Sequence, residues 1–402
     1  MNVLVVNTGS SSLKFQLFNM KDETWLARGI CERIGSKEAF MVYEKNGAED
    51  EIKTSIVASN HDEAFKYVFE SLVDKSNGAI NDLSEIGAIG HRVVHAGEKF
   101  AASVLIDDSV VAALNDCVEL APLHNPPNIT GIKACRSLMP DVPMVGVFDT
   151  AFHQTIPKEA FMYGLPYELY EKYGVRRYGF HGTSHRYVSA KAAELLGKRL
   201  EEVSLVTCHL GNGSSISAIK NGKSVDTSMG FTPLEGLVMG TRSGDIDPAI
   251  IGFISEKLNM TANEVCLDYL NKKSGVLGLS GGISNDFRNL TEAAKEGNEL
   301  AALAIDVFVY RIVKYIGSYA AAMGSLDGIV LTAGIGENSV DIRKMICNRL
   351  GMFGVVLDQE KNAIRRKELV ITKTDSKVPV MVVPTNEELV IARDTYEIVL
   401  SN

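Results

Sequence analysis

One short turn occurs twice in this chain. The first copy is Asn7-Thr8-Gly9-Ser10-Ser11-Ser12, and the second is His209-Leu210-Gly211-Asn212-Gly213-Ser214-Ser215, about half of the 402 residues further on. Each copy follows an apolar run and precedes an alternating one, a pattern that predicts strand, tight turn and strand. Recurrence at this spacing indicates a duplicated β-unit, whose two turns we expect to face each other across a cleft.

The length of the chain predicts two domains, because 402 residues exceed the size at which one core usually stops growing. The net charge is −9, and the longest basic run is Arg365-Arg366-Lys367. This balance argues against nucleic-acid and membrane-surface partners. An anionic ligand would therefore need a local cluster of positive residues.

The N-terminus has no basic leader, and no apolar run approaches the ~18 residues of a membrane span. The 6 cysteines show no C-x-x-C spacing, which predicts free thiols and neither a zinc site nor a disulfide framework. We therefore expect a cytoplasmic protein.

Strands and helices alternate along both halves. Buried strands are predicted at 86–95, 144–148, 328–332 and 378–383, and helices at 61–73, 110–120, 248–257, 261–271 and 301–323, with a further helix after Glu388. This order predicts an α/β fold with largely parallel central strands, in which ligands lie beyond the carboxyl ends of the strands. Arg92 lies near the end of one such strand, and Asp149 follows another. The glycine-rich stretch 230–248 has neither the helical nor the strand period of apolar residues, and a loop of this length predicts a functional role.

The Gly9 turn has the chemistry of a phosphate site, because small residues let backbone N–H groups approach an anion. Ser10 and Ser12 add hydroxyl donors, and Lys14 adds a charge. An ordinary serine-rich hairpin is the alternative, against which the second copy argues. The stretch Asn221-Gly222-Lys223-Ser224 lacks the first glycine of a P-loop and instead predicts a type I′ hairpin turn.

Gly334-Ile335-Gly336-Glu337-Asn338 follows a buried strand and opens a helix, as a nucleotide-binding turn does. A plain tight turn is the alternative, and the spacing is not that of an NAD fingerprint. Arg92 and Arg242 present forks suited to phosphoryl or carboxylate oxygens. The alternative for each is a structural salt bridge, for Arg242 with Asp245 or Asp247. The histidine spacings do not favour a metal site.

Three stretches resemble the acetate kinase family. They are Asn7 to Lys14, Arg176-Arg177-Tyr178-Gly179-Phe180-His181-Gly182-Thr183-Ser184-His185, and Thr227-Ser228-Met229-Gly230-Phe231-Thr232-Pro233-Leu234-Glu235-Gly236. The resemblance implies two duplicated actin-like (ribonuclease H-like) α/β domains around a central cleft, at 1–150 with 386–402 and at 151–385. It also implies a homodimer, and reversible transfer of the ATP γ-phosphoryl group to acetate with Mg²⁺, or Mn²⁺ as an alternative.

The same resemblance assigns roles to individual residues. It implies Arg92 and Arg242 as the phosphoryl clamp, Asp149 as the catalytic carboxylate and His181 as the transition-state stabiliser. Asn7 and Glu387 are expected near the metal and Lys14 near the substrates, and the acyl methyl group is expected at Val94, Leu123, Phe180 and Pro233. The nucleotide is expected along Ser10, Ser12, His209, Leu210, Gly211, Asn212, Gly213, Asp286, Phe287, Arg288, Gly334, Ile335, Gly336, Glu337 and Asn338.

Acetate is already an anion at neutral pH, so Asp149 has no substrate proton to remove. We therefore expect Asp149 to hold Mg²⁺, directly or through water, with proton abstraction as the lesser alternative. A propionate or other short-chain acyl kinase is the nearest alternative function. A non-metabolic ATPase of the actin or Hsp70 kind is a more distant one, because fold alone does not determine function.

Overall fold

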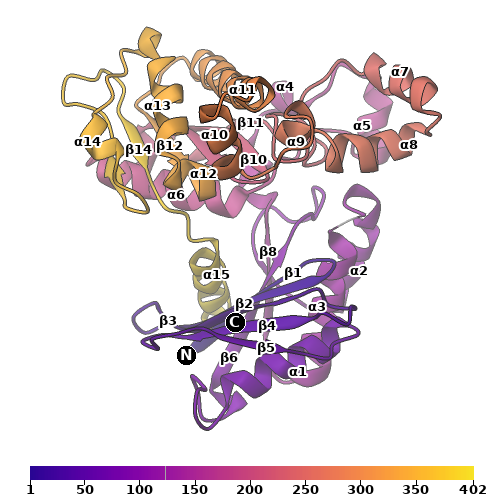
Figure 1. Ribbon diagram of the computed structural model, residues 1–402. Helices are drawn as coiled ribbons and strands as arrows, with labels where there is room; N and C mark the ends of the chain where they lie inside the picture. The colour runs from indigo at the N-terminus through magenta and orange to yellow at the C-terminus, as the bar shows by residue number, and fades with distance from the viewer. Residues whose placement is uncertain (123) are drawn as a thin grey trace. The chain divides into compact units, whose positions relative to one another are not determined.

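The computed structural model describes residues 1–122 and 124–402, and the chain divides into two compact units (Figure 1). Unit 1 consists of Met1–Phe152 and Asn386–Asn402, and unit 2 of His153–Thr385. Within the described residues, no helix has the length and apolar character needed to cross a membrane.

Unit 1 is a mixed sheet with the strand order β5-β4-β3-β2-β1-β6-β8-β7 and helices on both faces. Its strands are β1 (Asn2–Thr8), β2 (Ser12–Asn19), β3 (Thr24–Glu32), β4 (Phe40–Lys45), β5 (Ile52–Ser55), β6 (Ile86–Val93), β7 (Val104–Leu105) and β8 (Met144–Phe148). Its helices are α1 (His61–Leu72), α2 (Asp108–Asp116), α3 (Asn125–Leu138) and α15 (Glu387–Ser401).

Unit 2 is built on a second mixed sheet with the order β11-β10-β9-β12-β14-β13. Its strands are β9 (Ser204–Leu210), β10 (Ser214–Lys220), β11 (Lys223–Thr227), β12 (Gly328–Thr332), β13 (Leu369–Val370) and β14 (Val380–Val382). Its helices are α4 (Lys158–Phe161), α5 (Tyr167–Tyr173), α6 (Gly182–Leu195), α7 (Ala249–Leu258), α8 (Ala262–Glu264), α9 (Gly275–Leu279), α10 (Phe287–Lys295), α11 (Glu299–Met323), α12 (Ala333–Asn338), α13 (Val340–Asn348) and α14 (Gln359–Asn362).

The two sheets share one topology. In unit 1 the hairpin β1–β2 is antiparallel, and β1, β6 and β8 run parallel to one another. In unit 2 the hairpin β9–β10 and the parallel strands β9, β12 and β14 repeat this pattern. The flanking strands β3 and β11, and β7 and β13, are antiparallel to their neighbours in both sheets. The predicted duplication and the α/β fold class are confirmed.

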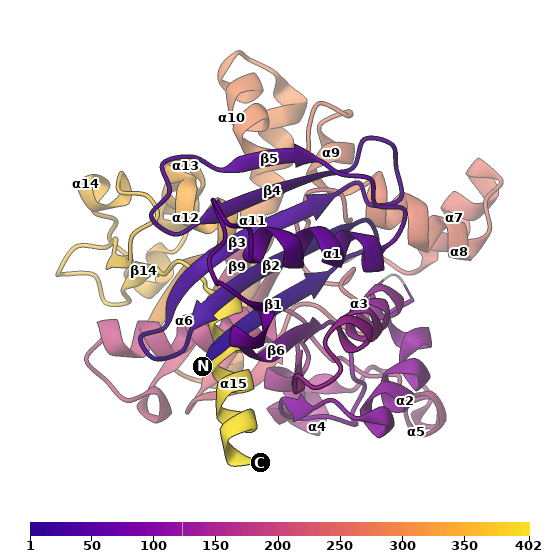
Figure 2. The same cartoon turned by 90° about the horizontal axis from the view of Figure 1, so that it is seen from below.

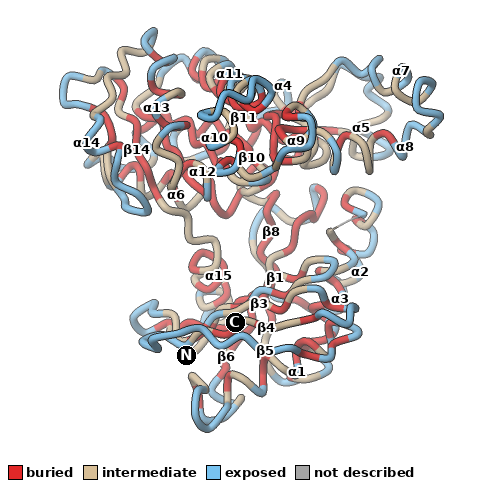
Figure 3. Tube along the Cα trace, in the orientation of Figure 1, coloured by how far each residue is buried: buried red, intermediate tan, exposed pale blue. Residues whose placement is uncertain are grey.

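Neighbouring residues of β6 face different helices of unit 1, because side chains alternate along a strand. Ile89 belongs to the hydrophobic core that includes α1 and α3. A Cβ on the next residue, Gly90, would stand only 2.4 Å from Thr395 Oγ1 of α15. Figure 1 shows α15 on the side of the sheet opposite to α1, and Figure 2 shows α1 in front of the sheet. The buried central strands appear red in Figure 3. The C-terminal helix thus completes unit 1.

Helix α3 is not among the helices predicted from the sequence, and it contains prolines at 126 and 127. The structure places them in the first turn of the helix, where a missing N–H costs little. The predicted hairpin turn at Asn221 and Gly222 is confirmed, since both residues have positive φ and connect β10 to β11. The stretch 230–248 contains neither helix nor strand, as predicted. The described cysteines are all free.

Candidate active site

Two predicted site residues of unit 1 meet at the carboxyl ends of β6 and β8. Arg92 lies on β6, and Asp149 follows β8, where its backbone N–H donates to the carbonyl of Val93 at 3.0 Å. Arg92 Nε donates to Asp149 Oδ1 at 2.9 Å and Nη2 to Oδ2 at 2.6 Å. Asp149 is only 1% exposed. The arrangement is a bidentate, charge-assisted pair, the strongest kind of side-chain hydrogen bonding.

A cluster of charges surrounds this pair within unit 1. Burial alone would lower the pKa of Arg92, but the charges of Asp149 and Glu387 raise it above its ordinary value. Glu387 is the first residue of α15. Burial, together with the charges of Asp149 and Glu388, raises the pKa of Glu387 to about 7 against the opposing effect of Arg92 and Lys14. These mutual effects show that the predicted residues lie in one electrostatic environment.

Glu387 also carries a buried acceptor, its Oε1. Among the described residues, its Oε1 has no hydrogen-bond partner. Asn7 and Lys14 are directly opposite each other in the β1–β2 register. Within residues 1–122 and 124–402, no group of three or more His, Cys, Asp or Glu side chains forms a ready metal cage. A cation held by one carboxylate, an amide oxygen and substrate phosphates remains compatible with this donor set.

The Gly9 turn joins β1 to β2 at the same end of the sheet. Gly9 N–H donates to the carbonyl of Ser12 at 2.8 Å, and His61 Nε2 lies 2.9 Å from the carbonyl of Gly9. A Cβ on Gly9 would stand 2.7 Å from Ser12 Oγ, so a side chain there would displace that hydroxyl. Ser10 is exposed. A side chain at position 9 would thus alter how the turn presents its hydroxyls.

Val94, the first predicted acyl-pocket residue, is buried just after β6. Its backbone N–H donates to Asn128 Oδ1 at 3.0 Å, and Asn128 Nδ2 donates to the carbonyl of Thr8 at 2.8 Å. Asn128 therefore ties together the ends of β1 and β6, a contact that the sequence did not reveal. Leu123, the second predicted pocket residue, lies outside the described residues.

In unit 2, His181 and Arg242 converge on the second copy of the turn. A Cβ on Gly213 would stand 3.5 Å from Arg242 Nη1 and 3.7 Å from His181 Nε2. Arg242 Nη1 donates to the carbonyl of Pro233 at 3.3 Å. Phe180 is buried and precedes His181. The structure thus brings His181 and Arg242 to the Gly213 turn, with Pro233 in contact with Arg242.

The proposed salt-bridge alternative for Arg242 is wrong. Asp245 instead accepts hydrogen bonds from Tyr315 Oη at 2.6 Å and from Gly236 N–H at 2.8 Å. Asp247 accepts from the N–H of Ala249. In the described part of the chain, Arg242 forms no ion pair, and burial lowers its pKa below the ordinary value. A half-buried guanidinium without a counterion favours an anionic ligand.

The loop that carries Arg242 is anchored by residues that the sequence analysis did not assign. Arg177 donates to the carbonyls at positions 227, 228 and 229 and to Glu235 Oε1 at 2.6 Å. Tyr163 Oη hydrogen-bonds to Glu235 and accepts from Phe231 N–H. Because these contacts hold 227–235 at several points, the loop is a fixed support for Arg242.

His181 has unusual backbone geometry. Its φ of 58° lies in the left-handed region, where a side chain other than glycine is strained, and it caps the N-terminus of α6. Its ring stacks on His209 with the centroids 4.1 Å apart. His209 Nδ1 is 2.8 Å from Ser184 Oγ, so this second ring is also held. His181 and His185 are one helical turn apart on α6, although the intervening Gly182-Thr183-Ser184 by itself predicts a turn.

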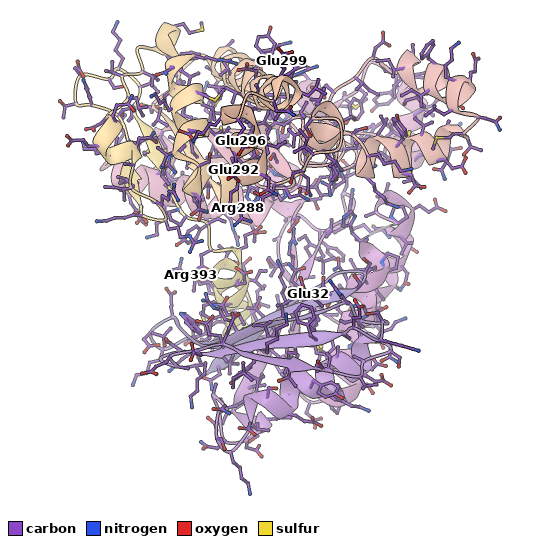
Figure 4. The ribbon with its side chains drawn as sticks, in the orientation of Figure 1. Glu32, Arg288, Glu292, Glu296, Glu299 and Arg393 are labelled. Atoms are coloured by element: carbon purple, nitrogen blue, oxygen red, sulfur yellow. The ribbon has the colours of Figure 1, made fainter. Side chains whose placement is uncertain are left out.

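A large cavity in unit 2, of about 1350 Å³, contains much of the predicted nucleotide site. The predicted residues that line it are Gly211, Asn212, Asp286, Phe287, Arg288, Gly334, Ile335 and Asn338. Figure 4 shows three lining residues in succession, Arg288 and Glu292 on α10 and Glu296 just after its end. Pockets of this kind at the ends of α/β strands commonly hold small molecules.

The other predicted nucleotide residues of unit 2 are not among the residues that line this cavity. His209 and Leu210 are buried at the end of β9, and Gly336 and Glu337 belong to α12. The fully buried Arg343 donates to the carbonyls of Gly336 and Glu337 at 3.1 and 2.7 Å. Ser10 and Ser12 belong to unit 1.

Sequence reasoning missed several lining residues, among them Lys295, Asp341, Arg365 and Arg366. Lys295 and Asp341 form an ion pair of 2.9 Å that links α10 to α13. Arg366 Nε donates to Asn338 Oδ1 at 2.9 Å. The basic run at 365–367 was a usable signal, because it is the only such cluster in an acidic chain.

Comparison with known proteins identifies the family of the chain. The model of the Acetokinase family matches residues 2–393. The chain belongs to the acetokinase family. It is 60% identical over 402 residues to the acetate kinase of Thermoanaerobacterium thermosaccharolyticum, with all of both chains covered. It is 58% identical over 401 residues to the acetate kinase of Carboxydothermus hydrogenoformans, again with 100% of both chains covered.

Solved structures of acetokinase-family proteins are also similar over nearly the whole chain. The acetate kinase of Porphyromonas gingivalis has a TM-score of 0.93 and 47% identity, with 99% of each chain covered. A propionate kinase from Francisella tularensis has a TM-score of 0.91 and 44% identity, covering 98% of this chain and 99% of that one. The predicted resemblance is therefore confirmed at the level of the family.

Proposed function

We propose that this chain catalyses the reversible in-line transfer of the γ-phosphoryl group of ATP to acetate, giving acetyl phosphate and ADP. The observation that carries the proposal is the full-length identity of 60% to a curated acetate kinase. The convergence of Arg242 and His181 on the Gly213 turn, beside a cavity of about 1350 Å³, supports it.

The residues supply charge stabilisation and positioning, which is most of what phosphoryl transfer requires from a protein. Arg242, which lacks a carboxylate partner among the described residues, binds the oxygens of the transferring group. His181 donates a hydrogen bond to the same group. The cavity between α10 and α12 binds the adenosine and diphosphate portion of ATP.

The charged pair of unit 1 completes this chemistry. Arg92 stabilises the anionic acceptor, and Asp149, whose two oxygens both accept from Arg92, keeps that guanidinium in place. Acetate needs no general base, because its carboxylate is already the nucleophile. Val94, Leu123, Phe180 and Pro233 surround the acyl methyl group in this proposal.

Mg²⁺, or Mn²⁺ in its place, fits the donors of unit 1. Two features of Glu387 fit a role as a cation ligand: its buried Oε1 has no hydrogen-bond partner among the described residues, and burial raises the pKa of its carboxyl. Glu387 and Asn7 would hold the ion, with Asp149 contributing directly or through water. When bound, such an ion neutralises charge on the phosphate oxygens.

We further propose that the chain is a homodimer. Helix α7 has no buried residue, and its Ile250, Phe253 and Leu258 are 39%, 62% and 47% exposed. Apolar surface of this kind commonly marks a protein interface. Light scattering coupled to size exclusion should give twice the chain mass, and Phe253→Glu should shift it toward the monomer.

We also propose a cytoplasmic location, and two domains at 1–150 with 386–402 and at 151–385.

Steady-state assays with ATP and acetate, propionate or butyrate test the proposed function. We expect the highest kcat/KM with acetate and a lower value with propionate, because a hydrophobic pocket discriminates one methylene by about 10 to 200-fold. The similarity to a propionate kinase makes propionate the second candidate substrate. A higher kcat/KM with propionate would assign the chain to that reaction. No phosphorylation of any acyl substrate would refute both.

A further inference from the structure

A continuous chain of hydrogen bonds leads from His181 into the interior of unit 2. Ser215 Oγ lies 2.9 Å from His181 Nδ1 and 2.8 Å from His185 Nε2. His185 Nδ1 in turn lies 2.7 Å from Thr207 Oγ1. Ser215, His185 and Thr207 are each 0% exposed. We call these three residues, which belong to β10, α6 and β9, the histidine relay.

Counting protons leaves two arrangements of the histidine relay. Burial, with smaller effects of His153 and His209, lowers the pKa of His185 well below 6.5, so its ring is neutral. A neutral imidazole donates from one nitrogen and accepts at the other, and a serine hydroxyl has one proton to donate. If Ser215 accepted from both rings, its own buried proton would lack an acceptor, which is costly. When His181 is neutral, the three hydrogen bonds therefore all run toward His181 or all run away from it.

The inner end of the relay decides between the two directions. Within the described residues, the hydroxyl of Thr207 has His185 Nδ1 as its hydrogen-bond partner and no other. If the relay ran away from His181, Thr207 would accept there, and its own proton would lack an acceptor in a dry interior. Leaving a buried donor unsatisfied is costly. Thr207 therefore donates to His185, His185 to Ser215, and Ser215 to His181 Nδ1.

We infer that the histidine relay is a set of positioning residues that keeps the proton of neutral His181 on Nε2. The inference rests on the proposed function, in which His181 acts as a donor. His181 Nε2 and Arg242 Nη1 lie 3.7 and 3.5 Å from one point, the position that a Cβ on Gly213 would take. With its single proton on Nε2, the neutral His181 ring donates to a phosphoryl oxygen at that point and needs no second proton. The opposite tautomer would present a lone pair to the anion.

Nuclear magnetic resonance of ¹⁵N-histidine-labelled protein tests the tautomer without any substrate. At a pH well above 6.5, with the His181 signals identified by their loss in His181→Gln, we expect the proton on Nε2. Thr207→Ser keeps the hydroxyl and should preserve this state, whereas Thr207→Val keeps the shape and should populate the Nδ1–H form. A wild-type proton on Nδ1, or a Thr207→Val spectrum identical to wild type, would overturn the inference.

Kinetics provide a second, independent test. Ser215→Ala should lower kcat by about 10-fold or more with little change in KM for ATP, as expected when a donor to a charged group loses its orientation. Ser217→Ala is the matched control, because it removes another buried hydroxyl on the same face of β10, one that bonds to Thr227 instead. Its kcat should stay within about two-fold of wild type. Equal losses in the two variants would mean that Ser215 is merely structural.

The two readouts separate this inference from the proposed function. If Ser215→Ala does not fold, the wild-type tautomer and the Thr207 pair still decide the question. If the wild-type protein fails to phosphorylate acetate, the proposed function is refuted, while the tautomer of His181 still shows whether the relay operates. An Nε2–H tautomer supports the relay, and an Nδ1–H tautomer refutes it.

Discussion

Replacing Arg242 by methionine should remove activity without weakening the fold. Methionine keeps an unbranched apolar side chain and loses the guanidinium. In the structure that group donates one hydrogen bond of 3.3 Å, to the carbonyl of Pro233, and its Nη1 also lies 3.9 Å from Met239 Sδ. If it binds the transferring phosphoryl group, kcat should fall by about 10²- to 10³-fold, the loss typical of one transition-state donor.

The stability of the same variant should move in an unusual direction. Arg242 forms no ion pair with the described residues, and its burial lowers its pKa, so the ligand-free protein gains little from its charge. We expect the free energy of unfolding to change by less than about 1 kcal/mol or to increase, because no buried partner is left unpaired. Substrate binding, not folding, explains a positive charge at this position.

Arg177→Met is the matched control, since Arg177 belongs to the same region and is paired. It would leave Glu235 and three backbone carbonyls without their donor, which typically costs about 3–5 kcal/mol. Acetyl phosphate formation measures kcat, and urea unfolding followed by circular dichroism measures stability. Activity of Arg242→Met within a few-fold of wild type, or a destabilisation as large as that of Arg177→Met, would refute the reasoning.

Three further predictions follow from unit 1. Asp149→Asn should be nearly inactive and should need more Mg²⁺ for half-maximal rate, whereas an unchanged Mg²⁺ requirement would exclude a metal-holding role. The pKa of Glu387 is about 7 when folded and 4.5 ordinarily, so the folded protein binds a proton that the unfolded chain releases. Without metal, the melting temperature should therefore fall as pH rises from about 4.5 to about 7, and Glu387→Gln should remove that slope. Val94→Ala should raise kcat/KM for propionate relative to acetate, chiefly through KM; an unchanged ratio would place Val94 away from the acyl group.

Local patterns along the chain determined much of the fold. The two glycine turns, each between an apolar and an alternating run, specified the hairpins β1–β2 and β9–β10, because strand and turn preferences act over a few residues. The buried strands before Asp149 and before Gly334 were evident for the same reason. Helix α3 was missed because Pro126 and Pro127 are compatible both with the end of a helix and with the first turn of one.

The sequence by itself determined which residue types carry the chemistry, and the tertiary structure decided how they are paired. Arg242 and Asp245 lie three residues apart and suggested an ion pair, yet Asp245 bonds to Tyr315 of α11, 70 residues away in the chain. The sequence likewise did not reveal the partners of Ser215. Its hydroxyl bonds to His181 and His185 because α6 packs against β9, the neighbour of β10 in the sheet. Hydrogen-bond partners are chosen by contacts between distant segments, and only folding brings those segments together.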